Sequence, residues 1–212
     1  MNTKFLLSIV ILKFLLLHYD PILADAPKNY FKGKFYKSVE NYFLVATAQM
    51  RDARFKKTVI LMLDNDENGS WGFVINKSIG SISLAELINI SQEERDEKET
   101  LYNEVIPIFW GGPVDETRIF ILHSKEYKNE STRHYKDISI SRDYKTLFDI
   151  AQKKGPKKSM VILGYSGWAS GQLEGEMEKG GWILSESDVD IIFHDQTNTK
   201  WPKARNKSFI RL

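Results

Sequence analysis

Apolar residues occur along this chain in short blocks, separated by polar, glycine-containing or proline-containing segments. Most blocks have the length of a buried β-strand and are too short for a typical globular helix. The predicted strands are residues 42–46, 59–63, 71–75, 105–110, 118–123, 138–140, 160–163 and 189–193. The second and third strands flank Asp64–Gly69, which ends in an Asn-Gly pair, so we expect a hairpin with a bulge or a wide turn.

Helical patterns are fewer than strand patterns. Ser83 and Glu86 have the spacing of a capping box, which predicts a short helix ending near Ile90. Residues 144–154 place their apolar side chains on one helical face and stop at a Gly-Pro pair. Because several strands follow one another without an intervening helix, the pattern predicts an α+β fold with a mixed or largely antiparallel sheet.

The stretch 159–182 is especially rich in glycine and aromatic residues. Its apolar strand ends in Gly164-Tyr165-Ser166-Gly167-Trp168, which predicts a tight turn. A short helical pattern follows and stops at a Gly-Gly pair before Trp182. Strand, turn and helix are therefore expected within one short segment.

The composition indicates one folded domain of ordinary size. The 212 residues are 42% apolar and 12% aromatic, which is sufficient for a packed core. With 30 basic and 28 acidic residues, the net charge of +2 is too balanced to indicate nucleic-acid binding. The chain has no cysteine, which excludes disulfides, thiolate nucleophiles and cysteine-ligated metals.

The N-terminus has the pattern of a secretory signal peptide. Residues 1–24 combine Lys4, an apolar segment interrupted by Lys13, and the small residue Ala24 at a cleavage position. A cleaved signal would make the protein exported or periplasmic. The alternatives are a cytoplasmic protein or an inner-membrane anchor, with transient membrane contact through this segment. The remaining divisions are a polar linker at 25–40, the folded domain at 41–198 and a basic, solvated tail at 199–212.

Three stretches of the domain carry a distinctive pattern. The first runs from Phe43 through Met50, Asp52 and Phe55 to Asn76-Lys77, the second is Gly111-Gly112-Pro113-Val114 with Phe120–His123 downstream, and the third is Gly164–Trp168 with Gly171–Glu174 and Trp182. In this order and spacing they resemble the YqgE/AlgH family of bacteria, from about residue 41 to about residue 194. Each motif alone is a weak signal, and the three in sequence identify the chain as a member.

The resemblance implies a compact α+β fold whose mixed, mostly antiparallel sheet is partly closed into a small barrel and flanked by helices. It also implies a largely uncharacterised family, in which the description of one member as a transcriptional regulator has spread by similarity. No catalytic residues are established for the family, so none is carried over. Family members have proline where this chain has Ala48 and Ala53, so the first loop lacks two constraints on φ.

Glycine turns beside aromatic residues predict a ligand-binding surface. The candidate ligand-binding residues are Gly111, Gly112, His123, Gly164, Ser166, Gly167, Trp168 and Gly171. Gly164, Gly167 and Gly171 could hold a small anion or a nucleotide on backbone N–H groups, or could serve close packing alone. Packing is favoured because their spacing matches neither the P-loop nor the dinucleotide-binding motif.

Catalytic and metal-binding alternatives have less support in the sequence. Ser166 follows a strand, as a hydrolase nucleophile would, but Trp168 replaces the second glycine of the nucleophile elbow. Three or four convergent ligands cannot be assembled, so neither a metal nor a cofactor is predicted. Trp168 and Trp182 either pack in the core or flank a binding groove.

The expectation is therefore a non-catalytic binding or regulatory protein. Its partner would be a protein or a small anion. DNA binding is disfavoured, because the domain has neither a helix-turn-helix nor a zinc-finger pattern.

Overall fold

The computed structural model describes residues 39–90 and 105–208. Its strands are β1 (Tyr42–Ala46), β2 (Val59–Asp66), β3 (Gly69–Val74), β4 (Ser78–Ser83), β5 (Val105–Trp110), β6 (Val114–His123), β7 (Arg133–His134), β8 (Ser139–Ser141), β9 (Ser159–Ala169) and β10 (Trp182–Glu186). Its helices are the 3₁₀ turn η1 (Ala53–Phe55), α2 (Leu84–Ile90), α3 (Tyr144–Ala151), α4 (Gln172–Glu178), α5 (Val189–Phe193) and α6 (Thr197–Asn206).

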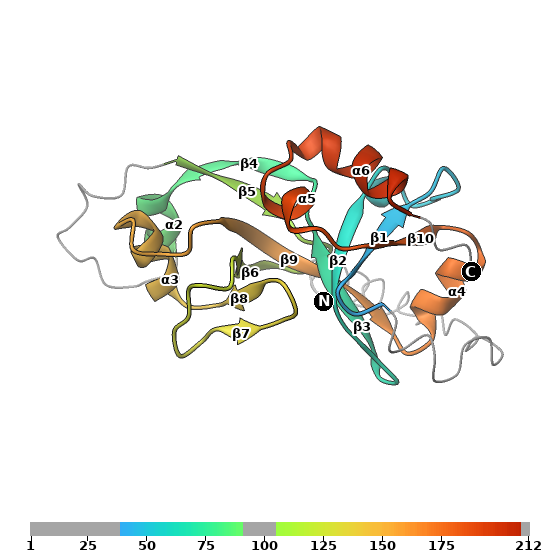
Figure 1. The fold of residues 1–212 in the computed structure, drawn as a ribbon, viewed down its shortest axis with the longest axis horizontal. Helices are drawn as coiled ribbons and strands as arrows, with labels where there is room; N and C mark the ends of the chain where they lie inside the picture. Colours follow the sequence, from blue (N-terminus) through green and yellow to red (C-terminus); the bar gives the residue numbers. More distant parts are fainter. Residues whose placement is uncertain (1–38, 91–104, 209–212) are drawn as a thin grey trace, which may run out of the picture.

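The strands form a single curled sheet organised around β9, the long strand that crosses the molecule in Figure 1. The main order is β10-β1-β2-β3-β9-β6-β8-β7, and β4 joins through β5. The first half of β9 pairs with β6 and, in parallel, with β5, whereas its second half pairs with β3. All other pairings are antiparallel. The predicted class, an α+β fold with a mostly antiparallel, partly closed sheet, is confirmed.

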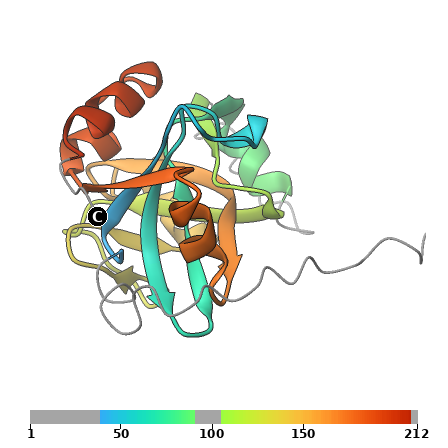
Figure 2. The ribbon, with the colours of Figure 1, turned by 90° about the vertical axis from the view of Figure 1, so that its right-hand side faces the viewer.

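The helices lie around the edges of this sheet. In Figure 2, α4 lies in front of the curled strands and α6 lies outside them. Helix α6 packs against β1, β2 and β10, while α4 packs against β3, β9 and β10. The principal core lies inside the curl, where β1, β2, β3, β6 and β9 contribute large buried side chains such as Phe43, Leu61, Phe73, Phe120 and Ile162.

The predicted glycine turn after residue 163 is wrong, because Gly164–Trp168 continues strand β9. Glycine is needed here for close approach of two backbones. A Cβ on Gly111 would lie 2.2 Å from the carbonyl oxygen of Gly164, and one on Gly164 would lie 2.7 Å from that of Gly112. Gly164 also has a φ of 69°, which marks a local irregularity in the strand. The packing interpretation of these glycines therefore fits the structure.

Residues 182–193 also differ from the predictions. Residues 189–193 form helix α5, not a strand, because the Asp188 side chain accepts a hydrogen bond from the N–H of Asp190 and caps a helical turn. Residues 182–186 form the edge strand β10, which was not predicted from the sequence. Short apolar runs fit both the helical and the strand period. The Asp188 cap therefore decides for helix α5, and the pairing with β1 decides for strand β10.

The predicted solvated tail also needs correction, because the boundary at 198/199 lies inside helix α6. Lys200 and Ala204 are buried, and the indole N–H of Trp201 donates to the carbonyl of Ala46 on β1, 2.9 Å away. The helix is thus part of the packed domain.

The β2–β3 hairpin and the first capped helix agree with their predictions. Asp66 pairs with Gly69 across a tight turn, and the register shifts between Met62 and Asp64, which is the expected bulge. The hydroxyl of Ser83 accepts the N–H of Glu86 at 3.1 Å, as one half of a capping box requires.

Candidate functional site

The three stretches that carry the sequence resemblance meet at one pocket of about 300 Å³. The first supplies Met50, Asp52 and Phe55, the second supplies Pro113, and the third supplies Ser166, Gly167, Trp168, Gln172 and Trp182. The pocket is completed by Gln49, Arg51, Arg54, Glu176, Lys179 and Gly181. We call this the tryptophan pocket. It lies where the end of β9, the start of β10 and helix α4 come together.

Glu176 of α4 is the polar centre of the tryptophan pocket. One carboxylate oxygen accepts both indole N–H groups, from Trp168 at 3.1 Å and from Trp182 at 2.8 Å. The other oxygen accepts the side-chain N–H of Gln172 at 3.1 Å. These bonds satisfy the carboxylate and the indoles together, so the two tryptophans turn ring carbons rather than free donors toward the cavity.

Aromatic rings form the apolar wall. Trp168 and Trp182 meet edge to face with their centroids 6.2 Å apart, and Phe55 meets Trp182 in a similar way at 5.6 Å. Both tryptophans are buried, and Met50 adds a flexible thioether. Such edge-to-face contacts hold ring orientations, so this wall is preformed.

Charged side chains lie at the rim. Asp52 accepts the N–H of Arg54 and caps η1, and the Arg54 guanidinium pairs with the same carboxylate at 2.7 Å. The hydrogen bond from Arg54 lowers the pKa of Asp52 below its usual value. Among the described residues, no carboxylate lies within ion-pair distance of Arg51 or Lys179. The rim therefore carries more positive than negative charge.

Of the predicted site residues, Ser166, Gly167 and Trp168 line the tryptophan pocket. Gly111, Gly112 and Gly164 form the backbone crossing that supports it, and Gly171 precedes α4 in a left-handed conformation with a φ of 74°. Whether any of these residues contacts a ligand stays a prediction.

His123 does not belong to this group. It is fully buried on β6, with Nε2 3.0 Å from the Ser141 hydroxyl and Nδ1 2.9 Å from the carbonyl of Ser124. Burial lowers its pKa. The imidazole is satisfied within the core, as expected of a structural histidine.

The geometry does not support the hydrolase or the anion-cradle hypothesis. The buried Ser166 hydroxyl donates to the carbonyl of Gly111 at 3.1 Å, and no histidine of the described residues lines this pocket. Gly164 and Gly167 lie within a strand, so their backbone forms no phosphate-binding turn. Over residues 39–90 and 105–208, no group of three or more histidine or acidic residues is placed to hold a metal.

Several lining residues were not predicted from the sequence, namely Gln49, Met50, Arg51, Asp52, Arg54, Phe55, Pro113, Gln172, Glu176, Lys179 and Gly181. A signal was present, because most of these lie within or beside the three distinctive stretches. Their convergence depends on tertiary structure. Trp168 and Trp182 are buried and contact each other edge to face, so no groove runs between them, and together they form one wall of this pocket.

Comparison with known proteins places the chain in a family. A family model described as AlgH-like matches residues 43–211. The chain belongs to the AlgH-like family. Its relatives include a UPF0301 protein of Pseudomonas putida strain W619, 36% identical over 155 residues that cover 73% of this chain and 80% of the relative. A UPF0301 protein of Rickettsia canadensis strain McKiel is 35% identical over 174 residues, covering 81% and 89%.

Solved structures agree with the AlgH-like assignment. The solution structure of the AlgH protein from Pseudomonas aeruginosa is similar, with a TM-score of 0.69 and 30% identity over 82% of this chain and 90% of that chain. A Corynebacterium diphtheriae protein, DIP2367, shares the fold with a TM-score of 0.58 and 16% identity, over 78% and 84% of the two chains. The AlgH-like fold thus extends through α6, beyond the boundary predicted at residue 198.

Proposed function

We propose that this AlgH-like protein is a non-catalytic binding protein whose tryptophan pocket receives one large apolar side chain of a protein partner, flanked in the partner by acidic residues. The observation that carries the proposal is the meeting of all three family stretches at this one pocket. A regulatory role would then act through the partner protein, not through DNA.

The interior of the pocket favours an apolar anchor. Glu176, Gln172 and both indole N–H groups satisfy one another, so inserting an apolar group leaves none of them without a partner. A volume of about 300 Å³ is at the small end of ligand pockets and suits one aromatic or aliphatic side chain. Aromatic and methionine walls are typical of pockets that hold an interface anchor.

The rim favours acidic flanking residues. Arg51 and Lys179 carry charges without a carboxylate partner among the described residues, whereas Arg54 is paired with Asp52. Rim charges of one sign mainly set the specificity and the association rate of a partner. An acidic flank is therefore expected to bind better than a basic one.

The C-terminal basic residues give little support to DNA contact. Lys200 is buried, Lys203 pairs with Asp195 and Lys207 pairs with Asp188. These three ammonium groups are therefore either buried or paired with carboxylates of the same domain. A broad basic face, which duplex DNA requires, is not formed by the described part of α6.

Short peptides can test the proposal. We would titrate acetylated, amidated Asp-Phe-Asp, Lys-Phe-Lys and Asp-Ala-Asp, and record the ¹⁵N-labelled indole N–H signals assigned by Trp→Phe variants. The expected result is movement of the Trp168 and Trp182 signals with Asp-Phe-Asp, with affinity about tenfold above that of Lys-Phe-Lys. Asp-Ala-Asp should bind more weakly still, because it lacks the anchor.

Charge reversal at the rim provides the control. In the double variant Arg51→Glu/Lys179→Glu, the preference should invert toward Lys-Phe-Lys, while Arg205→Glu on α6 should leave it unchanged. If none of the peptides moves the two indole signals, or if the preference does not respond to the rim variants, the proposal is wrong.

A further inference from the structure

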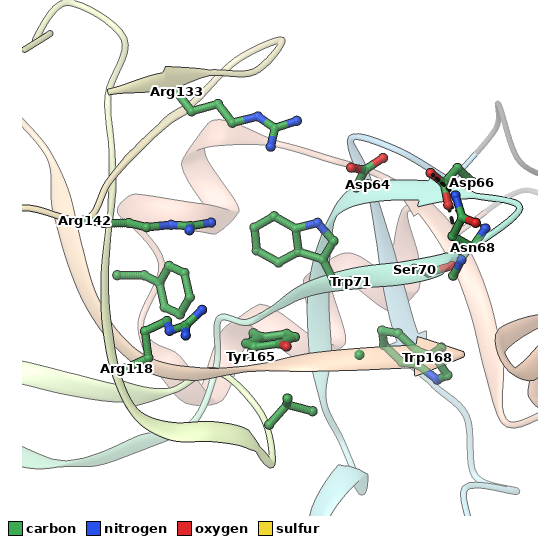
Figure 3. Close-up of a pocket in the computed structure, with 14 residues that line it drawn as sticks. Asp64, Asp66, Asn68, Ser70, Trp71, Arg118, Arg133, Arg142, Tyr165 and Trp168 are labelled. Carbon is green, nitrogen blue, oxygen red and sulfur yellow. Dashed lines mark hydrogen bonds between the residues drawn. The ribbon is translucent and has the colours of Figure 1, made fainter. Parts of the chain in front are cut away.

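A second cleft, of about 570 Å³, lies on the other side of the end of β9. It is formed by the β2–β3 hairpin, by β6 and β9, and by the segment from β7 to just after β8. Figure 3 shows three arginines on one side, Trp71 near the middle and two aspartates on the opposite side. We call it the arginine cleft.

The arginines form a basic wall of the cleft, and two of the three have no carboxylate partner among the described residues. Arg133 and Arg142 are exposed, and no carboxylate of the described residues lies within ion-pair distance of either. Each is held over an aromatic ring, Arg142 at 5.1 Å from the Phe120 centroid and Arg133 at 5.3 Å from that of Tyr135. Arg118 adds a third guanidinium, paired with Asp115 at 2.7 Å. Positioned guanidiniums suit phosphate oxygens, which they can bind two at a time.

Trp71 provides a ring surface and an unused donor. Its plane is close to perpendicular to those of Phe73 and Tyr165, at 86° and 81°, so its orientation is fixed. The indole N–H groups of the other four tryptophans all donate hydrogen bonds. That of Trp71 has no partner among the described residues, although the side chain is half-buried and lines the cleft.

The two aspartates opposite the arginines are not equivalent. Asp66 accepts the N–H groups of Asn68 and Gly69, so its carboxylate is engaged in closing the hairpin turn. The side chain of Asp64 is half-buried, and its carboxylate accepts no hydrogen bond from the described residues. It is placed to accept from an amino or hydroxyl group of a ligand.

We propose that the arginine cleft binds a nucleoside polyphosphate. The phosphates would lie against Arg118, Arg133 and Arg142, and the base would stack on Trp71, with Asp64 accepting from a base amino group or a ribose hydroxyl. Stacking on an aromatic ring tolerates any base, so the cleft selects the class rather than one nucleotide. The volume lies in the range of small-molecule sites, and the polar groups stand at opposite ends, as an elongated ligand with one anionic end requires.

This site is separate from the tryptophan pocket in its chemistry and in its reporter residues. The two share only Gly167 and Trp168 in their linings. Trp71 reports on the cleft and Trp182 on the pocket, so one spectrum distinguishes failure of this proposal from failure of the peptide-binding proposal.

The experiment is a titration of the full-length protein with ATP, with adenosine and with inorganic tripolyphosphate, followed by the indole ¹⁵N–¹H signals. We expect ATP to move the Trp71 signal, which is assigned by Trp71→Phe. Tripolyphosphate should bind about tenfold more weakly because it lacks the stacking base, and adenosine should bind weakest because it lacks the charge. Arg142→Ala and Arg133→Ala should each weaken ATP binding about tenfold.

Arg205→Ala is the matched control, because Arg205 lies over the Trp201 ring at 5.2 Å, outside the cleft. It should bind ATP as the wild type does, and unmoved indole signals elsewhere verify that each variant is folded. Equal affinity for ATP and tripolyphosphate would overturn the assignment of a nucleoside. No movement of Trp71, or ATP binding indifferent to both Arg142→Ala and Arg133→Ala, would overturn the site itself.

Discussion

At the scale of single residues, Lys200 is the most unusual side chain in the described part of the domain. It is 3% exposed, its ammonium group donates to the carbonyl of Ile192, and it lies 5.7 Å from the centroid of Phe109. Burial lowers its pKa from 10.5 to about 8, with partial opposition from Asp195. The charged form is therefore less favoured in the folded protein than in the unfolded chain.

This lowered pKa predicts how stability depends on pH. Between about pH 8 and pH 10.5 the unfolded chain holds a proton on Lys200 that the folded chain has lost, so stability should rise with pH in that window. The full effect corresponds to about 3 kcal/mol. Urea denaturation at several pH values should show this rise in the wild type and its loss in Lys200→Met.

Lys203→Met is the control, because Lys203 is an exposed lysine on the same helix. Its pH profile should match that of the wild type. A Lys200→Met variant that retained the wild-type slope would contradict the assignment of the rise to Lys200.

Gly112 tests the packing role of the glycines. It has a φ of 147°, and a Cβ there would lie 2.3 Å from the backbone N of Ser166. Gly80 has the same φ with no atom within 4 Å of the Cβ position. We expect Gly80→Ala to cost about 2 kcal/mol through backbone strain and Gly112→Ala about 4 kcal/mol, because the second also forces the β5–β6 loop away from β9. Equal losses in chemical denaturation would show that close approach is not the cause.

At the scale of elements, the sequence predicted most strands and both longer helices of the first two-thirds of the domain. The predicted strand at 160–163 was too short because Gly164 and Gly167 are typical of turns, yet pairing with neighbouring strands continues β9 past both glycines. Helix α5 and strand β10 were missed because their short apolar runs have no decisive period. Pairing with distant strands decided the outcome for β9 and β10, and local sequence does not contain that information, whereas the Asp188 cap decided it for α5.

Helix α4 gives a prediction at this scale, because Glu176 ties it to both β9 and β10 through the two indoles. Glu176→Ala leaves both indole N–H groups without an acceptor and should lower the free energy of unfolding by about 2 kcal/mol. Glu178→Ala, on the exposed side of the same helix, should change it by less than about 0.5 kcal/mol. Urea denaturation measures both, and similar losses would mean that helix propensity, not the indole bonds, is responsible.

At the scale of the whole molecule, the end of β9 lies between two pockets of different chemistry. The three family stretches contribute most of the lining of the tryptophan pocket. The sequence identified these stretches but did not predict that they meet. The arginine cleft is built from residues such as Arg133, Arg142 and Asp64, which come from separate loops and strand ends with no shared motif. Only the fold brings them together, so no pattern in the sequence could predict them.

The compartment of the protein would decide which of the proposed ligands can reach the two pockets. Among the described residues, no helix is both long and apolar enough to cross a bilayer. Residues 1–24 lie outside the described part, and their export function stays a prediction from sequence. Export would bring the arginine cleft to nucleotides outside the cytoplasm, whereas retention would expose it to the cytoplasmic pool.

We predict cleavage after Ala24, so the mature native protein should begin at Asp25. Mass spectrometry of the protein purified from the cell envelope fraction measures this directly. Ala24→Phe should block cleavage, because a large residue does not fit the peptidase position, whereas Ala26→Phe should leave it intact and thereby exclude cleavage two residues later. A native chain that begins at Met1 in the soluble cytoplasmic fraction would contradict the prediction.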